Sequence, residues 1–195
     1  VHTTPRAWVG GRGGGGRAPA PPRHRFLPDR VWLSGDDEVL TPCDRERQPE
    51  RWFAAAYGDV PVVTQVNDGQ EPADLSDALP SSSASAPSIV FRMLELLDLT
   101  TGMRVLEVGA GTGYNAALLS HRLGDDNVTT IEIDPTVAGL ARSNLAANGY
   151  SPTVVCGDGA LGWGSAAPYH VLGEAGSLRL DRAGQAGRCH PHSLV

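Results

Sequence analysis

Three glycines alternate in the stretch "VLEVGAGTGYNAALLS", residues 105–120, at positions Gly109, Gly111 and Gly113. Glycine lets the backbone turn sharply and approach a ligand without a Cβ in the way. The helix expected behind the turn would present free N–H groups to that ligand. The dinucleotide pattern G-x-G-x-x-G has a last glycine where this chain has Tyr114, which weakens an interpretation as an NAD site. The turn therefore indicates a site for an adenosine-containing ligand.

Acidic residues stand at the carboxyl ends of three successive expected strands. A carboxylate at Glu107, two residues before the first glycine, would repel a pyrophosphate but suits a ligand that bears an ammonium group. Glu132 lies where an acid can accept hydrogen bonds from ribose hydroxyls, and Asp158 lies where one can meet the adenine amine. The alternative is that each acid only caps a strand or the next helix. The predicted S-adenosylmethionine (SAM) site consists of Glu107, Gly109, Gly111, Gly113, Glu132, Asp158 and Gly159.

The elements that must position these residues alternate between strand and helix. "MRVLEVG" is apolar on both faces, as strands of a parallel sheet are. The pattern predicts a right-handed βαβαβ half of a Rossmann-like doubly wound α/β sheet. The expected strands are 103–109, 127–134 and 152–159, and the expected helices are 115–123 and 135–150.

Upstream of this half the patterns are weaker. A helix is expected over 49–60 and a strand over 61–66, and residues 68–85 are expected to form a loop of acids and then serines. A second helix is expected over 85–99, with Ser85 as a candidate N-cap. The preceding acidic stretch, 33–50, is interpreted as an insertion.

Composition excludes several classes of protein. All 16 basic residues are arginine, which rules out a Walker phosphate loop and a Schiff-base lysine for pyridoxal phosphate. The net charge of -6 argues against general nucleic-acid binding. No apolar run is long enough to predict a membrane span, and no His or Cys spacing predicts a metal site. A cytoplasmic protein without nucleic-acid or membrane partners is expected.

The motifs together resemble those of the protein-L-isoaspartate O-methyltransferases. "VLEVGAGTGYNAALLS", "VTTIEIDPTVAGLARSNLAANG" and "VVCGDGALGW" are similar to the SAM-binding motifs of that family. Upstream, "PRHRFLP", "AAAYGDVPV" and "SASAPSIVFRMLELLDL" resemble further family segments in the same order. The resemblance covers roughly residues 21–169 and implies a class I methyltransferase fold with SAM as the cofactor.

The resemblance also implies an activity and its partners. The family transfers the methyl group of SAM to the carboxylate of L-isoaspartyl residues in damaged proteins, and the ester then collapses to a succinimide, which begins repair. A carboxylate is already ionised at pH 7, so the reaction needs positioning and exclusion of water rather than a general base. The family's hydroxyl-bearing motif maps onto Ser83 and Ser85, which are the expected catalytic residues that orient the substrate carboxylate.

Two alternatives share these motifs. One is a carboxyl methyltransferase that modifies an Asp during the maturation of a peptide. The other is a SAM-binding remnant without catalytic activity.

The resemblance ends after Tyr169, where His170 stands in place of an expected Asp and the remaining chain has little apolar periodicity. The sheet is therefore expected to stop after its third strand, with its C-terminal half incomplete. The predicted division of the chain is a flexible Gly/Pro/Arg-rich arm (1–22), an N-terminal family region with a substrate-side helix (23–100), a SAM-binding βαβαβ half (101–169) and an atypical disordered tail (170–195).

Overall fold

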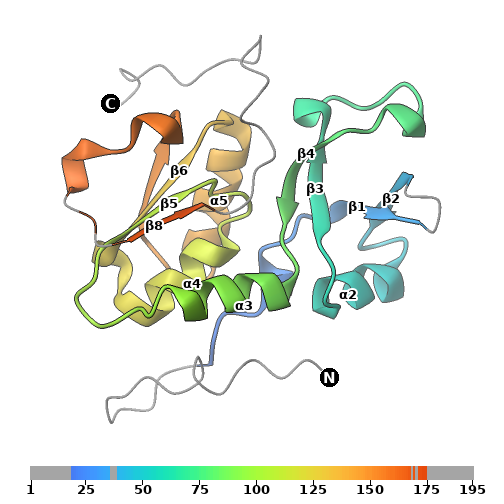
Figure 1. The fold of residues 1–195 in the computed structure, drawn as a ribbon. Helices are drawn as coiled ribbons and strands as arrows, with labels where there is room; N and C mark the ends of the chain where they lie inside the picture. Colours follow the sequence, from blue (N-terminus) through green and yellow to red (C-terminus); the bar gives the residue numbers. More distant parts are fainter. Residues whose placement is uncertain (1–18, 36–38, 168, 170, 175–195) are drawn as a thin grey trace.

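The computed structural model describes residues 19–35, 39–167, 169 and 171–174, and it contains two four-stranded sheets (Figure 1). The N-terminal sheet is antiparallel, with strand order β2-β1-β3-β4, and the second sheet is parallel, with order β7-β6-β5-β8. The first sheet consists of β1 (Arg30–Ser34), β2 (Leu40–Asp44), β3 (Val62–Val66) and β4 (Pro80–Ala84). The second consists of β5 (Val105–Val108), β6 (Val128–Glu132), β7 (Thr153–Cys156) and β8 (Val171–Glu174).

The N-terminal sheet packs on helix α2, Pro49–Tyr57, and their shared core includes Trp52, which is fully buried. Pro49 at the first helical position is compatible with a helix start because its missing N–H would have no partner there. Strands β1 and β2 pair as a hairpin, and β2 lies within the acidic stretch 33–50 that the sequence suggested as an insertion, so part of this stretch belongs to the N-terminal sheet.

The prediction of a loop over 68–85 was wrong for the C-terminal part of that stretch, because Pro80–Ala84 forms strand β4 and pairs with β3. A run of serines has little strand propensity of its own. Pairing with β3 supplies the strand conformation here, which is a tertiary effect.

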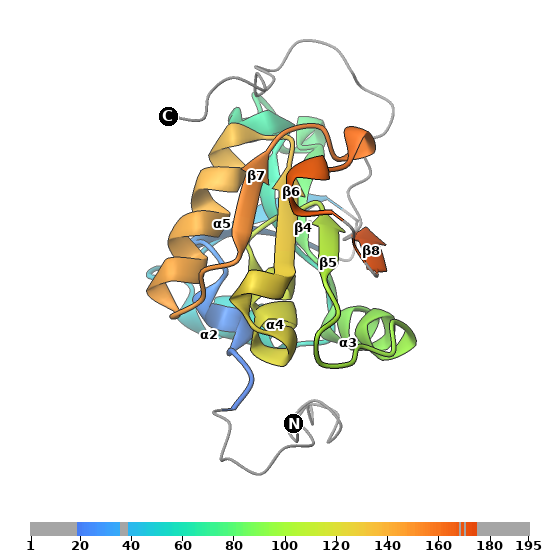
Figure 2. The same ribbon diagram turned by 90° about the vertical axis from the view of Figure 1, so that its left-hand side faces the viewer.

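The parallel sheet and its helices follow the predicted βαβαβ order. Helices α4 (Tyr114–Leu123) and α5 (Pro135–Ala147) pack along the sheet, and α3 (Pro87–Leu96) lies below the end of β5 in Figure 2. Apolar side chains of all three helices and of β5 and β6 form one core cluster. The expected helices and strands are therefore confirmed in type and order; α4 begins one residue earlier than expected, and the other elements are shorter by a few residues. This is usual where an end is set by hydrogen bonds rather than by hydrophobic pattern.

A fourth strand overturns the expectation that the sheet stops after three. Strand β8 lies parallel to β5 on the side away from β6, with Val105 opposite Val171 and Val108 opposite Glu174. The chain thus crosses to the other side of β5, as in a doubly wound sheet. Four residues are too few for a periodicity to predict them.

The predicted disordered tail was therefore wrong for 171–174, and its residues 175–195 lie outside the described part of the chain. Residues 1–18 of the predicted arm lie outside it too. Within the described residues, no helix is both long enough and apolar enough to cross a membrane.

Candidate functional site

The glycine turn joins β5 to α4 and is held against β6. Gly109, Gly111 and Gly113 all have positive φ values, of 88°, 53° and 85°, which side chains with a Cβ rarely adopt. The amides of Gly109 and Ala110 donate to the carbonyl of Ile131, at 2.8 and 3.2 Å. The backbone conformation predicted from the sequence is therefore confirmed.

The glycines have different surroundings. A Cβ at Gly113 would lie 3.1 Å from the carbonyl oxygen of Ala141 and 3.1 Å from Cγ of Leu145, so this glycine lets α5 approach the turn. A Cβ at Gly111 would have only the Ser83 carbonyl oxygen near it, at 3.8 Å. Gly111 is thus the glycine at which the turn faces the strand that carries the predicted catalytic serines.

Glu132, at the end of β6, binds the backbone of the turn. Its Oε2 accepts from the Gly111 amide at 3.0 Å, and its Oε1 accepts from the Asp134 amide at 3.2 Å. The carboxylate is partly exposed beside the turn. It combines a structural contact with a position from which it can also reach a ligand.

Glu107 lies beneath the turn with no exposed surface. Its Oε1 accepts from Asn115 Nδ2 of α4 at 2.6 Å, while Glu107 Oε2 and Asn115 Oδ1 have no hydrogen-bond partner among the described residues. Burial raises the pKa of Glu107 to about 7; the nearby Thr130 hydroxyl and the Asn115 amide act against this shift, and Glu132 adds to it. This carboxyl therefore keeps its proton to a higher pH than an exposed carboxyl does.

Asp158 and Gly159 follow β7. Asp158 is exposed and its Oδ1 accepts from the Ala160 amide at 3.0 Å, so it caps the short 3-10 helix Gly159–Leu161, as the alternative interpretation of the acids expected. A Cβ at Gly159 would lie 2.3 Å from Cγ1 of Val108 on β5. Packing against β5 therefore accounts for this glycine without any ligand.

The predicted catalytic serines lie at the end of β4 and just after it. Ser83 pairs with Val63 of β3, and Ser85 precedes α3. The N-cap of α3 is Ala86, so Ser85 is not the cap that the sequence suggested. Instead, the carboxylate of Asp59 accepts from the Ser88 amide in the first turn of α3, at 2.8 Å. The Ser85 hydroxyl is thus not used as a helix cap.

Three residues that sequence reasoning missed connect the site to its surroundings. Asn144 of α5 donates to the carbonyls of Thr112 and Phe26, at 2.9 and 3.1 Å. Gln65 of β3 donates to Asp134 Oδ2 at 3.1 Å and so joins the N-terminal sheet to the parallel half. Arg23 is buried and binds six backbone carbonyls. In the sequence, Gln65 stands within the largely apolar segment 62–66, whereas Arg23 and Asn144 stand beside other polar residues, and none of these patterns identifies a partner.

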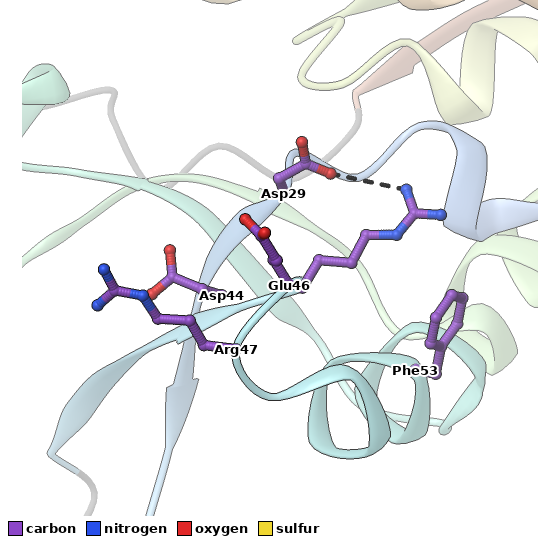
Figure 3. A pocket seen from close by; sticks show the side chains of 6 residues that line it. Asp29, Asp44, Glu46, Arg47 and Phe53 are labelled. Carbon is purple, nitrogen blue, oxygen red and sulfur yellow. Dashed lines mark ion pairs between the residues drawn. The ribbon is translucent and has the colours of Figure 1, made fainter.

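A separate hollow of about 480 Å³ lies on the N-terminal sheet (Figure 3). Arg45 pairs there with Asp29 at 3.6 Å, and its guanidinium lies over the rings of Trp52 and Phe53, at 5.0 and 5.3 Å. The charged groups that line the hollow are exposed or half-buried and of both signs, and none comes from the glycine turn. Among the described residues, no group of three or more metal-ligating side chains is present. The hollow is lined by Asp29, Asp44, Arg45, Glu46, Arg47 and Phe53.

Comparisons with known proteins agree with this arrangement. The family model for protein-L-isoaspartate(D-aspartate) O-methyltransferase matches residues 35–176, which extends past the end that the sequence motifs suggested. Protein-L-isoaspartate O-methyltransferase 1 of Archaeoglobus fulgidus is 42% identical over 126 residues, covering 64% of this chain and 52% of that protein. The corresponding protein of Methanococcoides burtonii is 47% identical over 123 residues, covering 62% and 54%.

Among solved structures, a protein-L-isoaspartate O-methyltransferase superposes with a TM-score of 0.57 at 28% identity, covering 79% of this chain and 40% of that one. The chain thus spans about half the length of the relatives it matches.

Proposed function

The chain belongs to the protein-L-isoaspartate(D-aspartate) O-methyltransferase family, and from that premise we propose that it transfers the methyl group of SAM to the carboxylate of L-isoaspartyl residues in proteins or peptides. The observation that carries this proposal is the contact between two segments. The carbonyl of Ser83, on the strand expected to orient the acceptor, lies 3.8 Å from where a side chain would begin at Gly111 of the glycine turn. The cofactor and acceptor segments therefore adjoin each other.

The residues of the turn fit SAM. The backbone at Gly111 is open on the side that a ligand would approach. The partly exposed Glu132 can accept from ribose hydroxyls. Glu107, which the sequence placed in the cofactor site, is wholly buried beneath the turn, and we assign it no contact with the ligand. We assign Glu132 to the ribose and Asp158 to the adenine.

When bound, SAM supplies an electrophilic methyl group on a sulfonium. The acceptor carboxylate forms a bond to the methyl carbon as the carbon–sulfur bond breaks, and the electron pair of that bond remains on sulfur. No proton has to move, so the protein's part is to hold the two reactants in line and to exclude water. We assign the orientation of the acceptor to the hydroxyls of Ser83 and Ser85, neither of which hydrogen-bonds another described residue through its side chain.

The proposal concerns a chain that spans about half the length of its relatives. Its test must therefore ask whether this chain binds the cofactor as well as whether it transfers the methyl group. The cytoplasmic location expected from the sequence remains a prediction.

The experiment uses methyl-labelled SAM and two peptides that differ only in having isoaspartate or aspartate at one position. Base-labile label on the isoaspartyl peptide alone supports the proposal. In a parallel reaction the Glu132→Ala variant should transfer little label, because it lacks the carboxylate assigned to the ribose, whereas Glu46→Gln, in the distant hollow, should behave as wild type.

The other outcomes identify the alternatives. Label on the aspartyl peptide alone would replace repair by dedicated modification of Asp. Cofactor binding by calorimetry without label on either peptide would leave a SAM-binding protein that is not an enzyme in this form.

A further inference from the structure

Arg23 lies between helix α2 and the segment that leads from β4 into α3, with only 4% of its surface exposed. Its Nη1 donates to the carbonyls of Ala55, Ala56 and Gly58, at 3.2, 3.3 and 3.4 Å. Its Nη2 donates to the carbonyls of Val60, Ala84 and Ser85, at 3.1, 3.0 and 3.1 Å. One side chain thus joins the end of α2 to the two residues that follow Ser83.

The charge of Arg23 has no close counter-ion. Among the described residues, no carboxylate lies within 4.0 Å of its guanidinium. Burial lowers its pKa, while Tyr114 at the end of the glycine turn and Asp59 favour the charged form at longer range. A guanidinium stays protonated at any physiological pH. A positive charge therefore lies behind the segment that would receive an anionic acceptor.

Asp59 holds the other end of the same segment. Its Oδ1 accepts from the Ser88 amide at 2.8 Å, whereas Arg23 binds the carbonyls of Ala84 and Ser85. Arg23 thus fixes the carbonyls of Ala84 and of Ser85 itself, and Asp59 fixes an amide three residues after Ser85. No contact with either charged residue is needed from the Ser85 hydroxyl, which stays available for a substrate.

We propose that Arg23 is a positioning residue for the acceptor carboxylate: it fixes the backbone of residues 84–85 and places a positive charge behind them. This inference rests on the proposed function for its substrate but not for the geometry of the segment. A lysine cannot replace the arginine in this role, because a single ammonium has three donors and lacks the planar fork that reaches six carbonyls. Arg23→Lys therefore separates geometry from charge.

The first measurement is hydrogen exchange of the backbone amides, which needs no activity. In Arg23→Lys, the amides of residues 82–86 and 88 should exchange at least tenfold faster than in wild type, while those of α4 should be unchanged. The matched control is Arg25→Lys, the same substitution at an exposed residue two positions along, and it should exchange as wild type. Unchanged exchange over 82–88 in Arg23→Lys would overturn the proposal, whatever the activity.

The second measurement compares KM for the isoaspartyl peptide with the Kd for SAM. Arg23→Lys should raise KM for the peptide at least tenfold and change the Kd for SAM less than twofold. If KM for the peptide and the Kd for SAM rose by the same factor, Arg23 would only support the fold, and the proposal would be overturned. If wild type methylates no peptide although exchange over 82–88 responds as expected, the proposed function fails and the positioning of the segment is supported.

Because Arg23 also holds the end of α2, its variants could fail to fold. Asp59→Ala then decides the question, since Asp59 is exposed and its loss removes the hydrogen bond to Ser88 at the other end of the segment. A severalfold rise in KM for the peptide with unchanged binding of SAM supports a positioned acceptor segment. An unchanged KM overturns it.

Discussion

Asn115 Nδ2 donates to Oε1 of Glu107 over 2.6 Å and so fixes a carboxyl group that is wholly buried between β5 and α4. The second oxygen of Glu107 has no partner among the described residues. A charged group in this position is costly for the folded state, and a protonated one is much less so. The carboxyl group of Glu107, which lies beneath the glycine turn, therefore changes its charge near neutral pH.

This relationship predicts how stability depends on pH. The pKa of Glu107 is about 7 in the folded chain against an ordinary 4.5, so the folded state binds more protons than the unfolded state between these values. The stabilisation is complete below pH 4.5 and is lost as the pH rises through 7, by a total on the order of 3 kcal/mol. Glu107→Gln has no such proton. In urea unfolding, the free energy of unfolding of Glu107→Gln should increase relative to that of wild type as the pH is raised from 5 to 8.

The control for this prediction is Glu46→Gln, which removes an exposed carboxylate and should follow wild type at both pH values. A constant difference between Glu107→Gln and wild type from pH 5 to pH 8 would contradict the prediction.

Glu132 should contribute to the affinity for the cofactor. A hydrogen bond to a charged group contributes about 1.5–3 kcal/mol, so Glu132→Gln should weaken SAM binding by roughly 10- to 100-fold. Its amide oxygen can still accept from Gly111, so the turn should keep its conformation. Isothermal titration calorimetry measures the change, with Glu46→Gln as the matched substitution. Unchanged affinity in Glu132→Gln would remove Glu132 from the ribose site.

Gly159→Ala should destabilise the protein without a specific effect on the cofactor. The new Cβ would lie 2.3 Å from Cγ1 of Val108, and relief of such a clash costs about 1–3 kcal/mol. The control Gly164→Ala should change stability little, because a Cβ there meets nothing within 4 Å. Thermal or urea unfolding gives both values.

A double variant tests the cause. Removing the branched side chain in Val108→Ala should make the loss from Gly159→Ala smaller, as a coupling between two groups in contact. Strictly additive losses would mean that the two positions do not clash.

The bond between Gln65 and Asp134 should matter for how the N-terminal sheet meets the parallel half. Gln65→Glu replaces the donor that lies 3.1 Å from Asp134 Oδ2 by a second carboxylate. We expect a loss of stability of about 1–2 kcal/mol at pH 7 and low salt, which added salt should partly reverse. Gln70→Glu, at an exposed residue, is the matched control. Equal stability of both variants in urea unfolding would show that the bond contributes nothing.

Local pattern was sufficient to predict one half of the fold. The strand before Gly109 can be predicted from a short apolar run, and the helix after Gly113 from the helical spacing of its apolar residues. Both patterns are formed by residues that are close together in the sequence. The acids at the ends of β6 and β7 could be found in the same way. Glu132 was indeed placed beside the turn, since parallel strands bring their carboxyl ends to one edge of the sheet.

Other features depend on partners far away in the sequence. The serine strand β4 exists through pairing with β3, and β8 through pairing with β5. Glu107 looked like a ligand-facing acid and is buried, because the side of a strand on which a residue lies is known only when the helices that cover it are placed.

By itself, the sequence of this protein determined the order of its parallel half, the glycine turn and the resemblance that named its chemistry, since each is a property of adjacent residues. The tertiary structure decided that Gly159 is required by Val108, that Arg23 and Asp59 fix the segment around Ser85, and that Gln65 joins β3 to Asp134. These are contacts between segments tens of residues apart. They arise only when the chain has folded. A hydrogen bond or a close approach depends on two distant residues together, and it produces no periodic pattern in the sequence around either one.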